Sequence, residues 1–245
     1  MTLCWSVSRD SGYLAQKVAL PSYVTANLFL NLDANSYSGS GVTWSDLSGN
    51  GRNATLTNGP TYSGANGGYF HFTDTSFQSA ITASVPSLTT WSVECWYRAT
   101  KSWSANTKVT ALVCNEFDLV NKLNYSIGSN NAPSSYNIAG GFYDGSWHTT
   151  SGLSPTLNTW YQALVTYNGS IVTQYSNGVS QSTLTYSGTP QSGGAIRIAR
   201  RWDNASNVAT DFYDGDISIV RIYSGALSSA QVLQNFNAIR GRYGI

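Results

Sequence analysis

The chain has 245 residues, of which 41% are hydrophobic and only 10% charged, and its formal net charge is +1. Such a weak net charge predicts no long-range attraction to nucleic acids or to anionic membranes, so no nucleic-acid partner is expected. Ser, Thr, Asn, Gly and Tyr replace the missing charges, and these residues suit turns and half-exposed strands.

The beginning of the chain has no feature of an export signal. MTLCWSVSRDSGYLAQ lacks a basic start followed by an apolar core, so we expect synthesis in a cytoplasm without a signal peptide. No apolar run approaches the ~20 residues of a membrane span. Residues 1–25 are predicted to form an irregular arm, in which Trp5, Tyr13 and Tyr23 either pack on their own domain or dock on a partner. Residues 26–245 are predicted to form one domain.

Alternating apolar residues predict strands along most of this domain. The segment after Ala26, NLFLNLDAN, has the period of a strand with one strongly buried face. Residues 36–62 are rich in Gly, Asn and Ser and predict a long structured loop. WSVECWYRA at 91–99 carries an aromatic residue on both faces, so it belongs inside a sandwich. AIRIARRW at 195–202 is predicted to be one further strand.

Turn signals separate these strands. Asn168-Gly169 joins two strand-like runs, and Asn177-Gly178 opens a second hairpin turn. About a dozen short strands with such turns between them predict an all-β fold, a two-sheet antiparallel β-sandwich or jelly roll.

The last 35 residues are predicted to complete this sandwich with a strand. Ile217 and Ile219 share one face of it, and Val220 and Ile222 share the other. A strand with two apolar faces needs cover on both sides.

One short C-terminal helix follows. Ser228 and Gln231 have the spacing of a capping box. An apolar stripe and a C-terminal cation with glycine then complete the helix pattern. Val232, Leu233 and Phe236 form the apolar stripe. Arg240 and Gly241 are the C-terminal cation and glycine.

The cysteines do not describe a disulfide framework. Cys95 and Cys114 lie in apolar strand-like runs, where buried free thiols are more common than a bridge between the two.

Three segments, read together, resemble the concanavalin A-like, laminin G-like jelly-roll domains over residues 27–245. They are LFLNLDANSYSGSGVTWSDLSGNGRNATLTNGPTY, TWYQALVTYNGSIVTQYSNG and DGDISIVRIYSGALSSAQVLQNFNA. WSDLSGNGRNATL is similar to a branch frequent in tailed-phage proteins, marine ones especially, and in bacterial surface proteins. NFNAIRGRYGI resembles the phage versions. The resemblance implies a domain used for glycan binding or as a virion surface ornament.

The sequence has no pair of carboxylates at the spacing that a glycoside hydrolase of this kind requires. A glycoside hydrolase needs two carboxylates roughly 5–9.5 Å apart across one sugar, and the resemblance implies an E-x-D-x-E strand for such enzymes. Glu94 has no carboxylate two residues away on either side, and the nearest acidic cluster is Asp211, Asp214 and Asp216. His71 and His148 have no zinc-ligand spacing with the cysteines. The chain is therefore predicted not to be an enzyme and to require no cofactor.

A structural Ca²⁺ is the metal to consider, because related domains often carry one. The candidate ligands are Asp33, Asp46 and Asp214, which lie in predicted loops or at strand ends. Many relatives carry an acid where Ser218 stands, so one ligand is missing. The favoured alternative is an Asx turn, with the Asp46 side chain bonded to the backbone of LSGNG.

Glycan binding needs exposed aromatic rings with polar groups beside them. Three tryptophans lie in polar, turn-rich surroundings, whereas Trp44, Trp91, Trp96 and Trp160 have the pattern of core residues. The predicted glycan-binding set, in which Asp144 is a further neighbour, is Trp103, Trp147, His148, Arg201, Trp202 and Asp203. The alternative for each such tryptophan is a loop anchor.

The sequence thus predicts a non-enzymatic virion structural or surface protein, a capsid decoration, tail or fibre component with a lectin-like domain. Its expected partners are other virion proteins, copies of itself and host-surface glycan, and its expected location is the virion surface. The alternatives are a stand-alone carbohydrate-binding adhesin and, remotely, a glycoside hydrolase.

Overall fold

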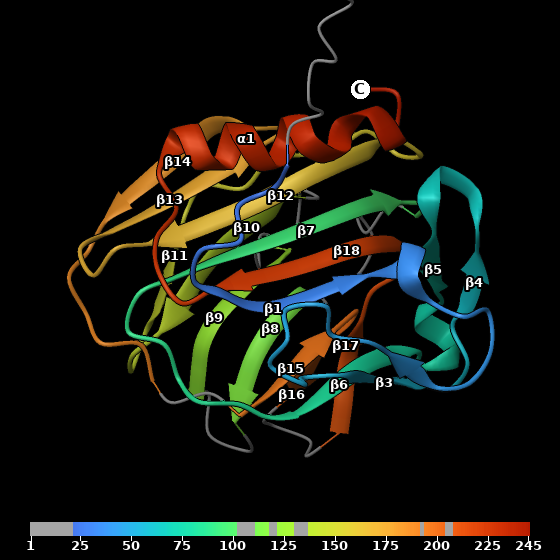
Figure 1. The fold of residues 1–245 in the computed structure, drawn as a ribbon. Helices are drawn as coiled ribbons and strands as arrows, with labels where there is room; N and C mark the ends of the chain where they lie inside the picture. Colours follow the sequence, from blue (N-terminus) through green and yellow to red (C-terminus); the bar gives the residue numbers. More distant parts are fainter. Residues whose placement is uncertain (1–21, 102–110, 118–121, 130–136, 192–193, 204–207) are drawn as a thin grey trace, which may run out of the picture.

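The protein forms a sandwich of two antiparallel eight-stranded sheets (Figure 1). The computed structural model describes residues 22–101, 111–117, 122–129, 137–191, 194–203 and 208–245. Sheet A holds, in spatial order, β14 (Val179–Thr185), β13 (Ile171–Ser176), β12 (Trp160–Tyr167), β7 (Trp91–Ala99), β18 (Gly215–Tyr223), β5 (Tyr69–Phe72) and β4 (Thr61–Ser63), with β1 (Leu28–Asp33) also paired to β18. Sheet B holds β11 (Trp147–Thr149), β10 (Ile138–Tyr143), β9 (Lys122–Ser129), β8 (Ala111–Phe117), β15 (Ala195–Ile198), β6 (Ser79–Ser84), β3 (Ala54–Thr57) and β2 (Thr43–Trp44).

The core lies between the two sheets. Trp91 and Val220 point inward from sheet A, and Val113 and Phe142 point inward from sheet B, and all four are buried. Each sheet thus covers the apolar face of the other, which is what stabilises a sandwich. The predicted all-β, two-sheet fold with one short C-terminal helix is confirmed.

Strand β18 is buried along its whole length, but its faces differ from the prediction. Ile217 joins the inner core, whereas Ile219 packs with Trp96 on the outer face of sheet A. The register against β7 shifts between these two residues, so Ser218 is the extra residue of a β-bulge. The expectation that Ile217 and Ile219 share one face is therefore wrong, although both faces of β18 are apolar as predicted.

The segment AIRIARRW is two strands rather than one. Ala199 has a φ of 61°, in the left-handed region that L-residues rarely adopt. It ends β15 and turns the chain into β16 (Arg200–Asp203), which pairs with β17 (Val208–Phe212) as a separate hairpin. The Sγ atom of Cys114 in β8 lies 3.5 Å from the carbonyl oxygen of Arg200. β16 therefore leaves sheet B and passes beside the outer side of β8.

The predicted hairpin turns are present. Asn177 and Gly178 both have positive φ, 50° and 78°, as a tight turn between β13 and β14 requires. The described residues hold 18 strands in all, more than the dozen or so expected. The excess arises partly because the predicted loop at 36–62 itself contains short strands. Cys95 and Cys114 are both buried and free, so the interpretation as free thiols is confirmed.

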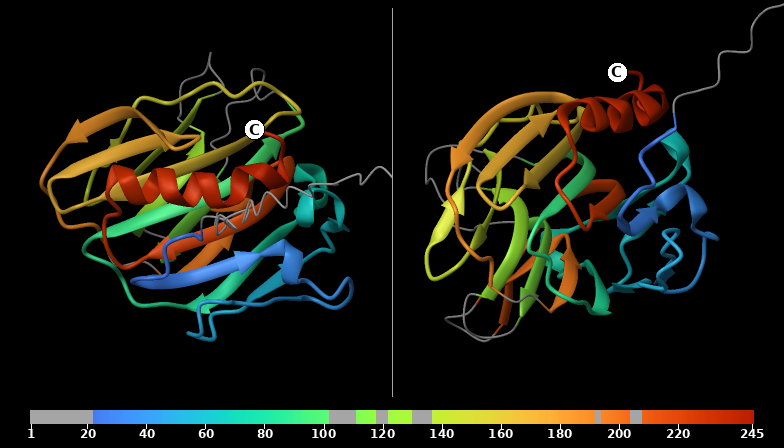
Figure 2. Two further views of the ribbon diagram at one scale, coloured as in Figure 1. Left: turned by 45° about the horizontal axis from the view of Figure 1, so that its top comes forward. Right: turned by 60° about the vertical axis from the view of Figure 1, so that its left-hand side comes forward.

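One α-helix, α1 (Ser229–Ile239), lies across the outer face of sheet A (Figure 2). Ser228 Oγ accepts a hydrogen bond from the Gln231 backbone N–H at 3.3 Å, and Gln231 Oε1 accepts one from the Ser228 N–H at 2.9 Å. The predicted capping box is therefore confirmed.

The buried side of α1 was predicted incorrectly in one position. Val232 and Ile239 are buried, but Leu233 is 45% exposed, and Asn235 is fully buried instead. Helical spacing places residues 232, 235 and 239 on one side. A sequence pattern assigns asparagine to solvent, but here its amide bonds to a buried carboxylate, as described next.

Candidate functional site

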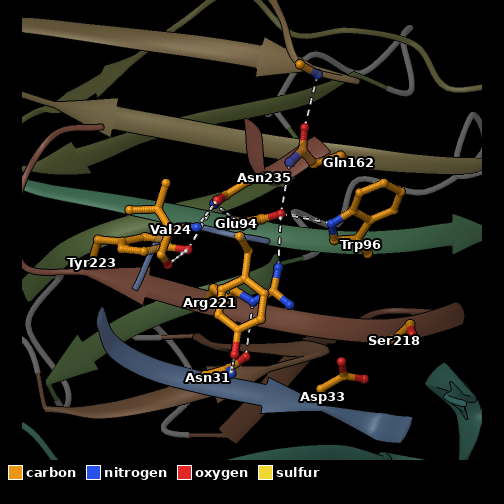
Figure 3. Close-up of polar contacts among 12 residues, drawn as sticks. Val24, Asn31, Asp33, Glu94, Trp96, Gln162, Ser218, Arg221, Tyr223 and Asn235 are labelled. Atoms are coloured by element: carbon orange, nitrogen blue, oxygen red, sulfur yellow. Dashed lines mark hydrogen bonds and ion pairs between the residues drawn. The ribbon is translucent and has the colours of Figure 1, made fainter. Parts of the chain in front are cut away.

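Beneath α1 lies a buried polar network centred on Glu94 (Figure 3). Its carboxylate is fully buried and accepts three hydrogen bonds, each 2.8 Å long. The donors are Trp96 Nε1, Gln162 Nε2 and Asn235 Nδ2, and Arg221 Nη1 lies 3.7 Å away. A buried carboxylate is tolerated only when it is paired and hydrogen-bonded in this way. The network therefore attaches the helix, through Asn235, to strand β7.

The same network fastens the beginning of the described chain. The Val24 N–H donates to Asn235 Oδ1 at 2.8 Å, and Tyr223 OH donates to the Val24 carbonyl at 3.1 Å. The guanidinium of Arg221 lies 4.0 Å from the centre of the Tyr23 ring. Tyr23 and Val24, the last part of the predicted arm, therefore pack on the sandwich. Trp5 and Tyr13 lie outside the described residues.

The position of Glu94 in this network does not fit a catalytic carboxylate. Its oxygens face the helix and hold three donors, so they cannot reach a sugar. In the acidic cluster near the start of β18, Asp216 is also engaged, 2.6 Å from Arg98 Nε and 2.8 Å from His71 Nδ1. His71 is thus within hydrogen-bond distance of a buried aspartate.

The predicted glycan site is divided by the alternation of strand β11. Successive residues of a strand point to opposite faces, and across the β10–β11 hairpin Tyr143 pairs with Trp147 while Phe142 pairs with His148. Phe142 belongs to the inner core. Trp147 therefore points to the outer face of sheet B, and His148 points inward. The two neighbours in sequence do not form one patch.

His148 belongs to a clamp that joins the edges of the two sheets. Its Nε2 lies 2.8 Å from Asp144 Oδ1, and its ring is stacked on Tyr186 with centres 3.5 Å apart. Tyr186 follows β14 of sheet A and donates its hydroxyl to Asp144 Oδ2 at 2.9 Å. Burial tends to raise the pKa of Asp144, but the hydrogen bonds from Tyr186 and His148 outweigh burial and lower it. We assign His148 and Asp144 to structure rather than to ligand contact.

Trp147 and Arg201 lie together on the outer face of sheet B. Trp147 is 40% exposed, and the guanidinium carbon of Arg201 lies 4.7 Å from the centre of its ring. The Tyr143 ring meets Trp147 edge-on at 5.5 Å and packs against Ala111 and Cys114. An aromatic ring with a cation over it and a second ring at its edge is held in place while staying accessible.

The cluster of Tyr143, Trp147 and Arg201 was predicted from the sequence only in part. The sequence singled out Trp147 and Arg201 separately, and the structure brings them together because the kink at Ala199 redirects β16. Tyr143 was missed, although hairpin pairing around Asp144-Gly145-Ser146 would have placed it opposite Trp147. Trp103 lies outside the described residues, and of Trp202 and Asp203 the structure describes the backbone in β16 only.

Three aspartates considered as calcium ligands do not converge. In the part of the chain that the structure describes, no three His, Cys, Asp or Glu side chains gather where they could hold a metal ion. Asp33 faces the guanidinium of Arg242, with contacts of 3.0 and 2.8 Å. Asp214 accepts a hydrogen bond from Thr100 Oγ1 at 3.1 Å.

Asp46 has the geometry of the alternative interpretation, the Asx turn. Its carboxylate accepts the backbone N–H groups of Asn31, Ser48 and Arg52 at 2.9–3.0 Å. Burial alone would raise the pKa of Asp46, but these hydrogen bonds hold it below its usual value. An aspartate that already accepts several donors organises its loop without an ion. These residues do not fit a calcium site.

The architecture is a two-sheet jelly-roll sandwich with a helix on one outer face and the partly exposed Trp147 on the other. A laminin G family model, described as concanavalin A-like lectin/glucanases superfamily, matches residues 64–233. The chain belongs to this superfamily. No curated protein sequence matches it.

Solved structures with this fold include binding domains of botulinum neurotoxins. The serotype C1 binding domain has a TM-score of 0.67 at 15% identity, and the type G receptor binding domain has 0.64 at 13%. The binding domain of neurotoxin DC in complex with SialylT has 0.65 at 15%. The matches cover 86–88% of this chain but only 51–52% of those chains. The chain thus spans about half the length of these neighbours, and the likeness shows the fold.

In the described residues, no helix has the length and apolar character needed to cross a membrane.

Proposed function

We propose that this chain is a non-enzymatic, glycan-binding surface module that uses the outer face of sheet B. The observation that carries the proposal is the 40% exposed Trp147 ring, held by Tyr143 and Arg201. The apolar face of a sugar ring packs on such an aromatic surface, and neighbouring cations and hydroxyls bind its polar groups. The buried Glu94 supports a role without catalysis, because the carboxylate is used to hold α1.

The comparisons support a binding role. The superfamily includes lectins, and a structural neighbour is described in complex with SialylT. Another is described as entering cells through interaction with two ganglioside molecules. These ligands belong to proteins about twice as long as this chain, so they suggest a ligand class and not a ligand.

We further propose that the module is a surface component of a tailed-phage particle, as a capsid decoration, tail or fibre protein. The support is the resemblance of WSDLSGNGRNATL and NFNAIRGRYGI to phage versions of the domain. Electron microscopy of purified particles tests this proposal. Density for the sandwich on the particle would support it, and free protein with particles that lack it would overturn it.

The glycan proposal is tested on a glycan array with purified protein and the variant Trp147→Ala. We expect the variant to lose at least ten-fold in affinity for the glycans that the wild type binds. Leu233→Ala is the matched control, because Leu233 is also a partly exposed apolar side chain, 45% exposed, but lies on α1 over the other sheet. Equal binding by wild type and Trp147→Ala would overturn the site.

Catalysis is tested on the same glycans by measuring reducing ends. We expect none to be released above background. Release that is abolished in Glu94→Gln, with the fold intact, would overturn the non-enzymatic proposal and restore the hydrolase alternative.

A further inference from the structure

The guanidinium of Arg201 has no acceptor in the described part of the chain. Its described contact is with the face of Trp147 at 4.7 Å, and its Nε atom is buried without a hydrogen-bond partner. Two other arginines of the sandwich have carboxylate partners. Arg98 bonds to Asp216, and Arg242 bonds to Asp33. Arg201 differs from these two arginines because its N–H groups have no acceptor among the described residues.

An unpaired buried donor costs free energy, and more when it is charged. The contact of the guanidinium with the indole face restrains Arg201 but satisfies none of its N–H groups. A planar fork of N–H donors matches an anion with two oxygens, because both can be bonded at once. The geometry of Arg201 thus fits an oxyanion from outside the protein.

The nearby acid does not compete for this position. Asp144 follows Tyr143 directly, but its carboxylate bonds to His148 and Tyr186 on the side toward sheet A. The clamp therefore uses the one described carboxylate of the β10–β11 hairpin. Among the side chains that the structure describes, the face that carries Trp147 and Arg201 is left with a cation; the side chain of Asp211, which pairs with Arg201 between β16 and β17, lies outside that description.

We infer that the Trp147 site binds an acidic saccharide, whose sugar ring packs on Trp147 while its carboxylate or sulfate group accepts hydrogen bonds from Arg201. This inference rests on the glycan-binding function proposed above and specifies its ligand class. The ring of Trp147 remains 40% exposed with Arg201 in contact, so surface is available for the sugar. Carboxylate and sulfate share the chemistry that the guanidinium recognises.

Titration calorimetry with three probes tests the inference: lactose, sialylated lactose and sulfated lactose. At low salt we expect at least one acidic probe to bind ten-fold or more tightly than lactose, with the advantage declining as salt is added. The variant Arg201→Gln should remove this advantage and leave the weaker binding of lactose. Arg201→Lys should retain part of it, because the charge stays but the two-pronged geometry is lost. Unchanged thermal unfolding checks that both variants fold.

The outcomes separate the two proposals. If lactose binds as tightly as the acidic probes and Arg201→Gln changes nothing while Trp147→Ala abolishes binding, the acidic specificity is wrong and the glycan site stands. If no probe binds, or if binding is insensitive to both positions, the site and its specificity are both wrong. The two acidic probes distinguish which anion is preferred.

Discussion

The two outer faces of the sandwich use similar residues in opposite ways. On sheet A, Trp96 and Arg221 lie beneath α1, and both are fully buried around the Glu94 carboxylate. On sheet B, Trp147 and Arg201 lie against each other without a carboxylate partner among the described residues, and the indole is partly exposed. Tryptophan and arginine thus take part in a buried network on one face and form the proposed binding site on the other.

The difference follows from what the polar groups are bonded to. Glu94, Gln162 and Asn235 bond to one another beneath α1, so their polar groups are not available to a ligand. A buried network held by such hydrogen bonds contributes to a single rigid arrangement. The open face has an arginine without an acceptor among the described residues, and the proposed ligand would supply one.

The largest effect is expected from Glu94→Ala on the covered face. The change leaves Arg221 and three buried donors without their carboxylate, so the free energy of unfolding should fall by about 3–5 kcal/mol. Urea denaturation followed by tryptophan fluorescence measures this loss. Glu94→Gln, which keeps the shape of the side chain, should cost less. A loss under 1 kcal/mol for Glu94→Ala would mean that the network does not hold the helix.

Alkaline pH should weaken the same face. Burial raises the pKa of Tyr243 from 10 to about 12, with nearby Arg242 lowering it in part. Because the folded pKa is the higher one, this stability is complete below pH 10 and is lost as pH rises toward 12, by up to about 2–3 kcal/mol. Burial also raises the pKa of Tyr223 beneath α1.

The contribution of Tyr243 is isolated by comparison with Tyr243→Phe. Between pH 10 and 12, the variant should lose stability less steeply than the wild type, by up to one proton. Unfolding by urea at a series of pH values measures both slopes. Equal slopes would show that Tyr243 titrates normally in the folded protein.

Substitutions on the open face should change the free energy of unfolding only slightly. Trp147→Ala removes a side chain that is already 40% exposed, so we expect a loss of about 0.5–1 kcal/mol. The same change should strongly reduce glycan affinity. A loss as large as that of Glu94→Ala would instead identify Trp147 as a loop anchor, the alternative interpretation of its sequence context.

The smallest effect is expected from calcium. Asp33 is paired with Arg242, and Asp46 already accepts several N–H groups, so adding Ca²⁺ or a chelator should leave the melting temperature within about 1 °C. A rise of several degrees that saturates with Ca²⁺ would show that an ion displaces one of these contacts.

Sequence patterns predicted the parts of this molecule that depend on local periodicity. The alternation of β7, the Asn177-Gly178 turn and the capping box of Ser228 all appear as expected. The errors occur where one residue changes the register or partner. Ser218 adds a bulge in β18. Ala199 adopts a left-handed conformation, which a sequence pattern predicts at glycine and not at alanine.

The site was predictable to a lesser degree, because contacts between distant strands determine it. Trp147 was identified as a surface aromatic, but its separation from His148 follows from strand alternation once β11 is recognised as a strand. The approach of Arg201 to Trp147 depends on the path of β16 after Ala199. Asn235 was missed because only a buried carboxylate partner makes an asparagine suitable for the inner side of a helix.

The most direct test compares the two faces in one experiment, by following the tryptophan indole N–H signals in NMR spectra while an acidic saccharide is added. Signals are assigned with Trp147→Phe and Trp96→Phe. We predict that the Trp147 signal shifts with the saccharide concentration, whereas the Trp96 signal, bonded to Glu94 at 2.8 Å, stays in place. A shift of Trp96 with no change at Trp147, for a saccharide that binds, would contradict the assignment of one locked face and one binding face.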